Sequence, residues 1–344
     1  MPALKLAVVG CGFWSSFQIA AWREFSRDVQ LVAVCDRDAG RAGATAARFG
    51  GVAAYTDAAE MLRREKPDVV DVITDVNTHA GFVELAASHG VAVICQKPMA
   101  PDLATARRLV ALTREKGVPF YIHENFRWQA PIRRLKAVLD AGGIGPVFKA
   151  RVSFCSAFPV FDNQPFLAEL DQFILTDIGS HVFDIVRYLF GEANTLHCLT
   201  RRVNPKIKGE DVANVLLEMT GGVHCYTEMS YASLLERETF PQTLVLAEGA
   251  RGSVHLDAGF VLKTTTRAGT RSETVQPARY DWVDPDYAVV HSSLVGCIGN
   301  LLDDLLGRGK AETTGADNLK TVELVFAAYD SAREGKIIRF GTGE

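Results

Sequence analysis

The chain has 344 residues, 48% of them hydrophobic and 23% charged, and its formal net charge at pH 7 is -4. This length predicts two domains, because one hydrophobic core seldom supports so long a chain. The negative net charge argues against a nucleic-acid partner, since phosphate binding requires a basic face. No apolar stretch is long enough to cross a bilayer and the N-terminal run lacks a cleavage site, so we expect a cytoplasmic protein without a membrane partner.

Seven cysteines are scattered singly along the chain. Their odd number and irregular spacing predict reduced, mostly buried thiols rather than a disulfide framework, and they predict no metal site.

The first apolar run, residues 5–9, leads directly into a glycine turn that contains Gly10 and Gly12, and a helix-like stretch follows. A second apolar run ends immediately before Asp36. This order predicts a dinucleotide site: Gly10 permits the tight turn, Gly12 lets backbone amides approach a pyrophosphate, and Asp36 accepts ribose hydroxyls. Ser15, which is small, stands at the third glycine position. An ordinary glycine-rich turn is the alternative interpretation.

The same acid predicts which cofactor is preferred. Asp36 would repel a 2′-phosphate, so the sequence favours NAD over NADP. Arg37 and Arg41 follow closely and leave use of NADP open.

The pattern of residues 1–122 predicts a Rossmann domain of the α/β class, built on a doubly wound parallel sheet. Short apolar runs alternate there with alanine-rich helical stretches. The expected strands are 5–9, 29–35, 69–73, 91–95 and 118–122.

Residues 123–344 predict an α+β domain. Strand-like runs follow one another without intervening helices, which favours a largely antiparallel sheet. The expected strands are 147–158, 212–219, 223–231, 242–247 and 253–257, with one helix near 177–190 and a helical tail near 291–334.

Ligands of open parallel sheets bind beyond the carboxyl ends of the strands, so the residues after each predicted strand are candidates. These loops contain Thr74, Asn77, His79, Gln96, Lys97, His123, Glu124, Asn125 and Arg127. Lys97 could hydrogen-bond a substrate hydroxyl, and a cis bond to Pro98 would direct it inward. A solvated loop lysine is an equally good interpretation.

The predicted helix near 177–190 carries a second group of candidates. Asp177, His181, Asp184 and Tyr188 form a polar stripe beside an apolar stripe, as expected for a cleft wall. Carboxylates flanking His181 would raise its basicity, which suits removal of a hydroxyl proton. Alternatively, Asp177 caps the helix and His181 is a hydrogen-bonded histidine at the edge of the core.

These motifs together resemble the Gfo/Idh/MocA oxidoreductases nearly from end to end. The matching features are the glycine turn, Asp36, Asn77 to His79, Gln96-Lys97-Pro98, Asn125 to Arg127, and Asp177 to Asp184. Gln96 is the main departure, because the family usually has Glu-Lys-Pro. Within the family, residues 94–98, 123–129, 164–167 and 202–213 resemble D-apiose dehydrogenases.

The resemblance also implies which residues form the active site. It implies that Lys97, His181 and Asp177 are catalytic, and it adds a substrate-binding set of Lys97, Asn125, Arg127, Asp177, His181 and Asp184. The expected cofactor contacts are Gly10, Gly12, Phe13, Trp14, Asp36, Arg37, Thr74, Asn77, His79, Gln96 and Lys97.

The resemblance also implies the reaction and the partners: hydride transfer between a sugar or polyol and NAD, with the anomeric carbon of D-apiose as one reacting centre. It implies a homodimer or homotetramer assembled through the C-terminal sheet. An inositol-type dehydrogenase or a ketosugar reductase shares the same residues, and a non-catalytic NAD-binding sensor is the alternative outside the enzymes.

Overall fold

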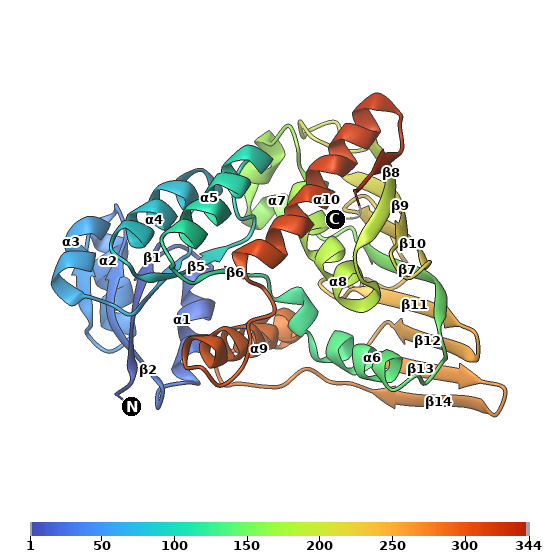
Figure 1. Cartoon of the computed structure of the whole chain (residues 1–344), viewed down its shortest axis with the longest axis horizontal. Coiled ribbons are helices and arrows are strands. Elements are labelled where there is room, and N and C mark those ends of the chain that lie inside the picture. The colour runs from blue at the N-terminus through green and yellow to red at the C-terminus, as the bar shows by residue number, and fades with distance from the viewer. Residues whose placement is uncertain (1, 342–344) are drawn as a thin grey trace. The chain divides into compact units, whose positions relative to one another are not determined.

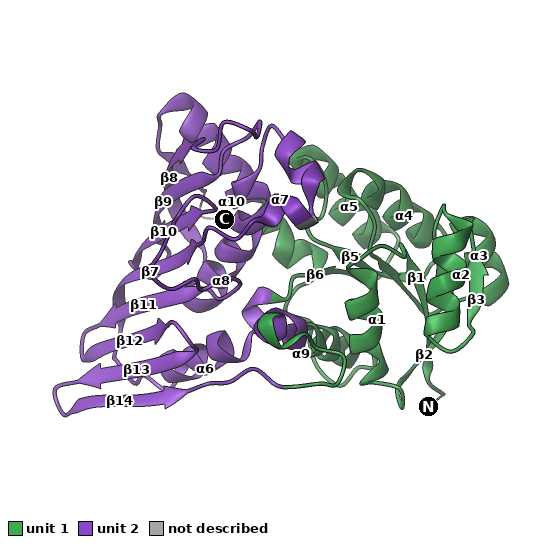
Figure 2. Cartoon of the chain, turned by 180° about the vertical axis from the view of Figure 1, so that it is seen from behind, with its two compact units in different colours: residues 1–125, 279–286, 294–322 green, residues 126–278, 287–293, 323–344 purple. Residues whose placement is uncertain are grey.

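The computed structural model describes residues 2–341. The chain forms two compact units (Figure 2). Unit 1 comprises Met1–Asn125, Arg279–Asp286 and Leu294–Val322, and unit 2 comprises Phe126–Ala278, Tyr287–Ser293 and Glu323–Glu344. The chain first passes from unit 1 to unit 2 close to the predicted boundary at residue 123. Two segments that the sequence analysis places in the second domain belong to unit 1.

Unit 1 is built on a six-stranded parallel sheet with the strand order β3-β2-β1-β4-β5-β6. This order is that of a dinucleotide-binding fold, which confirms the predicted doubly wound sheet. The short edge strand β3 was not predicted, because three residues carry too little pattern to be recognised. The strands are β1 (Leu4–Val9), β2 (Val29–Cys35), β3 (Ala53–Tyr55), β4 (Val69–Val72), β5 (Ala92–Gln96) and β6 (Phe120–His123).

Five helices connect these strands and lie along the sheet (Figure 1). They are α1 (Ser15–Arg23), α2 (Ala39–Arg48), α3 (Ala58–Glu65), α4 (Val76–Ser88) and α5 (Leu103–Glu115). The last four each begin at an aspartate whose carboxylate accepts a backbone N–H of the first turn: Asp38, Asp57, Asp75 and Asp102. These caps determine where each crossover enters its helix.

The segment Leu294–Val322 packs on unit 1 beside β6. The Ile122 N–H donates to the Thr313 carbonyl over 2.8 Å, and Tyr121 and Thr314 form an isolated antiparallel bridge. The predicted helical tail consists of two helices, α9 (Ala288–Leu305) and α10 (Gly315–Glu334). Gly307, with a φ of +68°, lies in the loop that separates them.

Unit 2 contains a nine-stranded sheet with the order β14-β13-β12-β11-β7-β10-β9-β8-β15. Its neighbours are antiparallel except β7 and β10, so the largely antiparallel prediction is confirmed. The strands are β7 (Val147–Cys155), β8 (Ala193–Arg201), β9 (Val212–Met219), β10 (His224–Ser230), β11 (Leu244–Gly249), β12 (Gly252–Asp257), β13 (Val261–Thr266), β14 (Gly269–Thr274) and β15 (Ile338–Arg339). Strands β8, β13, β14 and β15 were not predicted.

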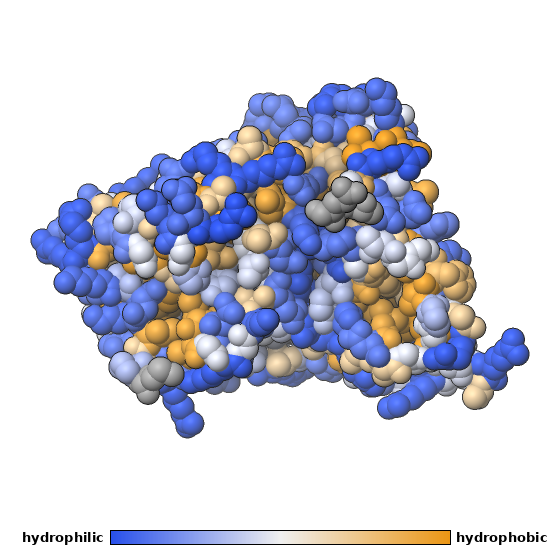
Figure 3. All heavy atoms as spheres, viewed as in Figure 1, coloured by the Kyte–Doolittle hydropathy of each residue, from blue (hydrophilic) through white to orange (hydrophobic). Residues whose placement is uncertain are grey.

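This sheet buries one face. Along β10, Cys225, Thr227 and Met229 are buried, whereas His224 and Tyr226 are exposed. Helices α6 (Ala130–Asp140) and α8 (Ser180–Phe190) lie on the buried side (Figure 2), and Figure 3 shows hydrophobic residues grouped beside them. Over residues 2–341, no helix covers the opposite face. A core on one side therefore explains the alternation along the strands.

Shorter elements complete the described chain. They are η1 (Phe126–Trp128), α7 (Val160–Asn163), η2 (Pro165–Glu169), the π-helical turn η3 (Leu175–Gly179) and η4 (Pro285–Tyr287). All seven cysteines are free thiols, six of them buried. Between residues 2 and 341, no helix is long and apolar enough to span a membrane.

Candidate active site

The glycine turn follows β1 and has the geometry that the sequence predicts. Gly10 has a φ of +103°, and a Cβ placed on it would lie 2.3 Å from the Ile73 carbonyl oxygen. No atom lies within 4 Å of a Cβ placed on Gly12. Gly10 is therefore required by the fold, whereas Gly12 leaves open space at the N-terminal end of α1, where the helix dipole favours an anion.

Ser15 occupies the third glycine position without disturbing the turn. Its side chain is buried, and its hydroxyl donates a 2.6 Å hydrogen bond to the Gly12 carbonyl. A small hydroxyl residue here joins the start of α1 to the turn.

Asp36 directly follows β2 and is bonded to the glycine turn. Its carboxylate accepts the Cys11 N–H over 2.8 Å and the Asp38 N–H over 2.9 Å. An ionised carboxylate has about four lone-pair sites, so these two bonds leave acceptor capacity for ribose hydroxyls. Arg37 is exposed beside it. The residues present thus fit a dinucleotide: an open glycine turn with an acid oriented beside it.

His79, predicted to contact the cofactor, joins two loops of the sheet edge. Its Nδ1 lies 3.0 Å from the Pro98 carbonyl and its Nε2 lies 3.1 Å from the Thr74 carbonyl. Burial lowers the pKa of this histidine. His79 therefore connects the loop after β4 to the loop after β5.

The loop after β4 has its own cap. Asp75 accepts the backbone N–H of Asn77 over 2.9 Å and its side-chain amide over 2.8 Å, while the Thr78 hydroxyl donates to that of Thr74. Thr74 and Asn77 are thus held at the start of α4.

Lys97 follows β5, at the same edge of the sheet. Its backbone N–H donates to the Gln96 side-chain oxygen over 3.2 Å, and its peptide bond to Pro98 is cis. The side chain of His123, the last residue of β6, is buried, as are those of Glu124 and Asn125 after it. Unit 1 therefore gathers the glycine turn, Asp36, Thr74, Gln96, Lys97 and Asn125 at the carboxyl ends of adjacent parallel strands, the usual ligand edge of such sheets.

The predicted helix of unit 2 differs from an ideal α-helix. Residues 175–179 form the π-helical turn η3, which continues into α8. A π turn shifts the helical wheel, and such turns occur frequently at functional sites. The side chains of Asp184 and His181 are buried. That the polar stripe borders a cleft stays a prediction. Tyr188 is the half-buried member of the stripe within α8.

Asp177 lies within the π turn and has an aromatic partner. The Tyr231 hydroxyl donates to its Oδ2 over 3.4 Å. Burial, together with the charge of Asp177, raises the pKa of Tyr231. The sequence analysis missed Tyr231, because it follows the end of β10, far from residue 177 along the chain.

His181 packs flat against Phe126. The two ring centroids are 3.7 Å apart and the ring planes differ by 6°. This stacking fixes the plane of the imidazole, so that its nitrogen edges have defined directions. Nothing in the sequence identifies Phe126 as this partner.

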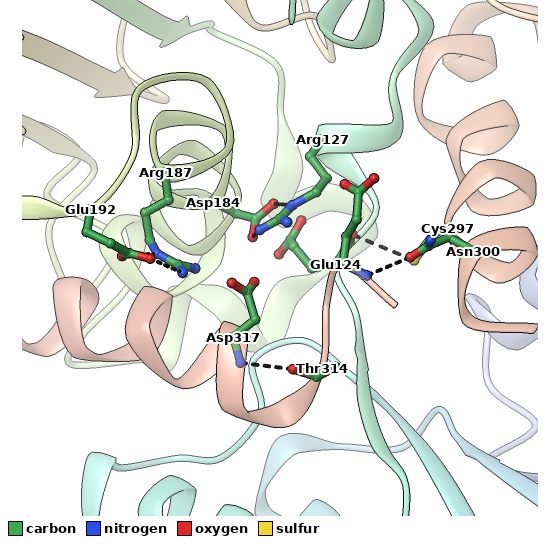
Figure 4. A network of polar contacts seen from close by, with 10 residues as sticks. Glu124, Arg127, Asp184, Arg187, Glu192, Cys297, Asn300, Thr314 and Asp317 are labelled. Atoms are coloured by element: carbon green, nitrogen blue, oxygen red, sulfur yellow. Dashed lines mark hydrogen bonds and ion pairs between the residues drawn. The ribbon is translucent and has the colours of Figure 1, made fainter. Parts of the chain in front are cut away.

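Arg127 and Asp184, both predicted to bind substrate, form a buried ion pair with each other. The Arg127 Nε and Nη2 donate to the two carboxylate oxygens over 2.8 and 2.5 Å, as Figure 4 shows. Their side chains are 6% and 0% exposed. Removing one partner of such a pair typically costs about 3–5 kcal/mol. The pair joins η1 to α8 and so holds the Phe126–His181 stack; direct contact of either residue with substrate stays a prediction.

The two halves of the predicted catalytic group lie in different units: Lys97 in unit 1, Asp177 and His181 in unit 2. Their meeting around one substrate stays a prediction. Among residues 2–341, no group of three or more His, Cys, Asp or Glu side chains is arranged to hold a metal ion.

Two family models match the chain. Residues 4–124 match the model described as "Oxidoreductase family, NAD-binding Rossmann fold", and residues 132–255 match the GFO/IDH/MocA C-terminal domain.

Several known proteins are similar over nearly their whole length. The chain is 45% identical to a D-apiose dehydrogenase of Paraburkholderia graminis, covering 97% of this chain and 89% of that protein. It is 41% identical to a D-apiose dehydrogenase of Rhizobium rhizogenes, covering 99% of both. A crystal structure of an oxidoreductase from Agrobacterium radiobacter in complex with NAD+, L-tartaric acid and magnesium has a TM-score of 0.95 and 41% identity, over 98% of each chain.

Proposed function

Because this chain belongs to the Gfo/Idh/MocA family of oxidoreductases and binds NAD through its Rossmann domain, we propose that it oxidises D-apiose at the anomeric carbon. The product would be a lactone together with NADH. The observation that carries this substrate is the 45% identity with a D-apiose dehydrogenase over 97% of the chain.

The proposed roles follow from the chemistry of each side chain. Bound NAD would supply the acceptor for the hydride that leaves the anomeric carbon. His181 takes the proton of the anomeric hydroxyl, because an imidazole nitrogen can act as a general base. Its stacking on Phe126 supports this role, since a base must hold one orientation.

Lys97 and Asp177 complete the proposed group. The Lys97 ammonium holds the reacting oxygen and stabilises its developing negative charge. Asp177 stabilises the charged imidazole of His181. Asp177 lies in a π turn and accepts a hydrogen bond from Tyr231. Because π turns occur frequently at functional sites, this position supports a catalytic role for Asp177.

The assay for this proposal is direct. Purified chain is mixed with NAD and D-apiose, NADH formation is followed by absorbance, and the product is identified by NMR. We expect turnover with D-apiose and a lactone product. Turnover with myo-inositol or D-glucose but none with D-apiose would refute the substrate and leave the reaction class intact.

We also propose a homodimer or homotetramer formed through the open face of the unit 2 sheet. That face carries exposed apolar side chains: Leu199, Leu216 and Tyr226 are 61%, 55% and 37% exposed there. Leu216 and Tyr226 are direct partners across β9 and β10. Apolar side chains grouped on an uncovered sheet face support a protein interface.

The proposed compartment is the cytoplasm. Seven free thiols support it, because cysteines of secreted proteins are commonly paired in disulfides.

A further inference from the structure

A carboxylate lies inside the central sheet of unit 1. Asp71 is the third residue of β4, between strands β1 and β5, and its side chain is 0% exposed. Its neighbours along the strand, Val70 and Val72, are buried apolar residues. A charge in such surroundings is costly unless it is hydrogen-bonded.

Two side chains of α1 supply those hydrogen bonds. The Gln18 Nε2 lies 2.9 and 2.7 Å from the two Asp71 oxygens, and the Trp22 Nε1 donates to Oδ2 over 2.7 Å. Positions 18 and 22 are four apart and so share one face of the helix. Both donors are neutral groups, and burial raises the pKa of Asp71 to about 6.

The hydrogen bonds continue toward Lys97 in one direction. An ionised carboxylate only accepts, so Gln18 must present its nitrogen to Asp71 and its oxygen to the other side. There the Gln18 oxygen accepts the Gln96 Nε2 over 2.5 Å. The Gln96 oxygen is consequently directed at the Lys97 backbone N–H, 3.2 Å away.

We propose that Asp71 is a positioning residue for Lys97, acting through the directed hydrogen-bond chain Asp71–Gln18–Gln96. This inference rests on the proposed function, in which Lys97 holds the reacting oxygen. The chain fixes the peptide from which the lysine side chain departs.

The same chain explains the departure of this sequence from the Glu-Lys-Pro pattern. A glutamate at position 96 has no N–H for the Gln18 oxygen, so two acceptors would face each other while Asp71 is ionised. The buried carboxylate can stand at position 71 or at position 96, with Gln18 turned one way or the other. Here it stands at position 71.

The experiment is a double-mutant cycle of Asp71→Asn and Gln96→Glu. In Asp71→Asn, the new amide nitrogen needs an acceptor. If Gln18 turns to provide one, Gln96 must turn as well, and its nitrogen then faces the Lys97 N–H. In Gln96→Glu, the introduced carboxylate faces the Gln18 oxygen.

The double variant restores a consistent direction. The asparagine amide at position 71 donates to Gln18, and Gln18 donates to the carboxylate at position 96. That carboxylate also accepts the Lys97 N–H, so every group is satisfied with the direction of the chain reversed.

Each protein is assayed for kcat with D-apiose and NAD, for the NADH dissociation constant by fluorescence, and for its thermal unfolding midpoint. We expect each single variant to lose about tenfold or more in kcat and the double variant to return to within about threefold of wild type. The unfolding midpoint should follow the same order, because each mismatch leaves a buried polar group unsatisfied. Gln30→Glu, the same change at an exposed position of β2, serves as the control and should match wild type.

A pH profile distinguishes positioning from general destabilisation. Protonation of the glutamate introduced by Gln96→Glu supplies the missing donor, so the ratio of the kcat of this variant to that of wild type should rise as pH falls. A merely structural defect would leave this ratio constant.

Several outcomes would overturn the inference. Additive losses in the double variant would do so, as would single variants that keep wild-type kcat. If the wild type forms no NADH with D-apiose, the proposed function fails and Lys97 loses its assigned role. The unfolding midpoints and NADH affinities then test the hydrogen-bond chain by itself. If the effects of the two substitutions on these quantities are not additive, the directed chain Asp71–Gln18–Gln96 is supported. If they are additive, the chain is refuted.

Discussion

At the scale of single residues, the side chains proposed for catalysis lie against neighbours that restrict their orientation. Phe126 fixes the plane of His181, and Tyr231 donates to Asp177. Arg127 and Asp184 satisfy each other as a buried bidentate pair. Positioning of this kind is what a proton-transfer site requires, because the reacting groups must be oriented before substrate binds.

Lys97 provides the most direct test of the enzyme against the sensor. We expect Lys97→Ala to lower kcat by roughly 10²–10³, because it removes one stabilising donor at the reacting oxygen. NADH affinity, measured by fluorescence titration, should stay within about threefold of wild type, since the glycine turn and Asp36 are unchanged.

Lys116→Ala, an exposed lysine at the end of α5, is the matched control and should keep wild-type kcat. Unchanged turnover in Lys97→Ala would remove the lysine from the mechanism.

Asp36 is expected to determine cofactor choice. Asp36→Asn keeps an oxygen that can accept the Cys11 N–H but removes the charge that repels a 2′-phosphate. The ratio of kcat/KM with NAD to that with NADP should fall about tenfold or more, which corresponds to about 1.4 kcal/mol. Wild-type chain that prefers NADP, or a ratio unaffected by the substitution, would contradict this role.

At the scale of elements, the two glycines of the turn between β1 and α1 are expected to serve different purposes: Gly10 is needed for folding and Gly12 for binding NAD. We expect Gly10→Ala to destabilise the fold by about 1–3 kcal/mol, because its positive φ and the Ile73 carbonyl leave no room for a Cβ. Gly12→Ala should keep the stability of wild type, since open space surrounds it, and should weaken NAD binding, since its Cβ occupies that space.

Urea unfolding and NADH titration of both variants measure the two effects. Equal loss of stability in Gly12→Ala would show that this glycine, too, serves the fold.

Strand β4 should make stability depend on pH. Burial raises the pKa of Asp71 from 3.8 to about 6, so between these values the unfolded chain binds fewer protons than the folded chain. The contribution of Asp71 to the free energy of unfolding is therefore full below pH 3.8 and is lost as pH rises through about 6. The shift corresponds to about 3 kcal/mol.

The measurement compares urea unfolding of wild type and Asp71→Asn across this pH window. The difference, wild type minus variant, should fall as pH rises toward 6 and be constant above it. A difference that increases over the window has the wrong sign and would place the pKa of Asp71 below its usual value.

At the scale of the whole molecule, the open face of the unit 2 sheet is expected to hold copies of the chain together. Light scattering after size exclusion should give the mass of two or four chains for wild type. Leu216→Glu puts a charge opposite Tyr226 on that face. The association constant should fall about tenfold or more, because burying an unpaired charge in an interface costs more than the about 1.4 kcal/mol to which a tenfold change corresponds.

Leu234→Glu is the control. Leu234 is 91% exposed but lies outside the strands, so its variant should assemble as wild type does. A monomeric wild type, or assembly unaffected by Leu216→Glu, would refute the sheet interface.

The sequence by itself determined the Rossmann sheet, the glycine turn and Asp36, because periodicity and turn chemistry are local and lie within a few tens of residues. Only the tertiary structure decided that Asp71 meets Gln18 and Gln96, that Phe126 stacks on His181, and that Arg127 pairs with Asp184. It also decided that residues 294–322 return to unit 1. The side-chain contacts join residues 53 to 78 positions apart. They depend on strand register, helix rotation and the inserted residue of a π turn, none of which a sequence pattern specifies.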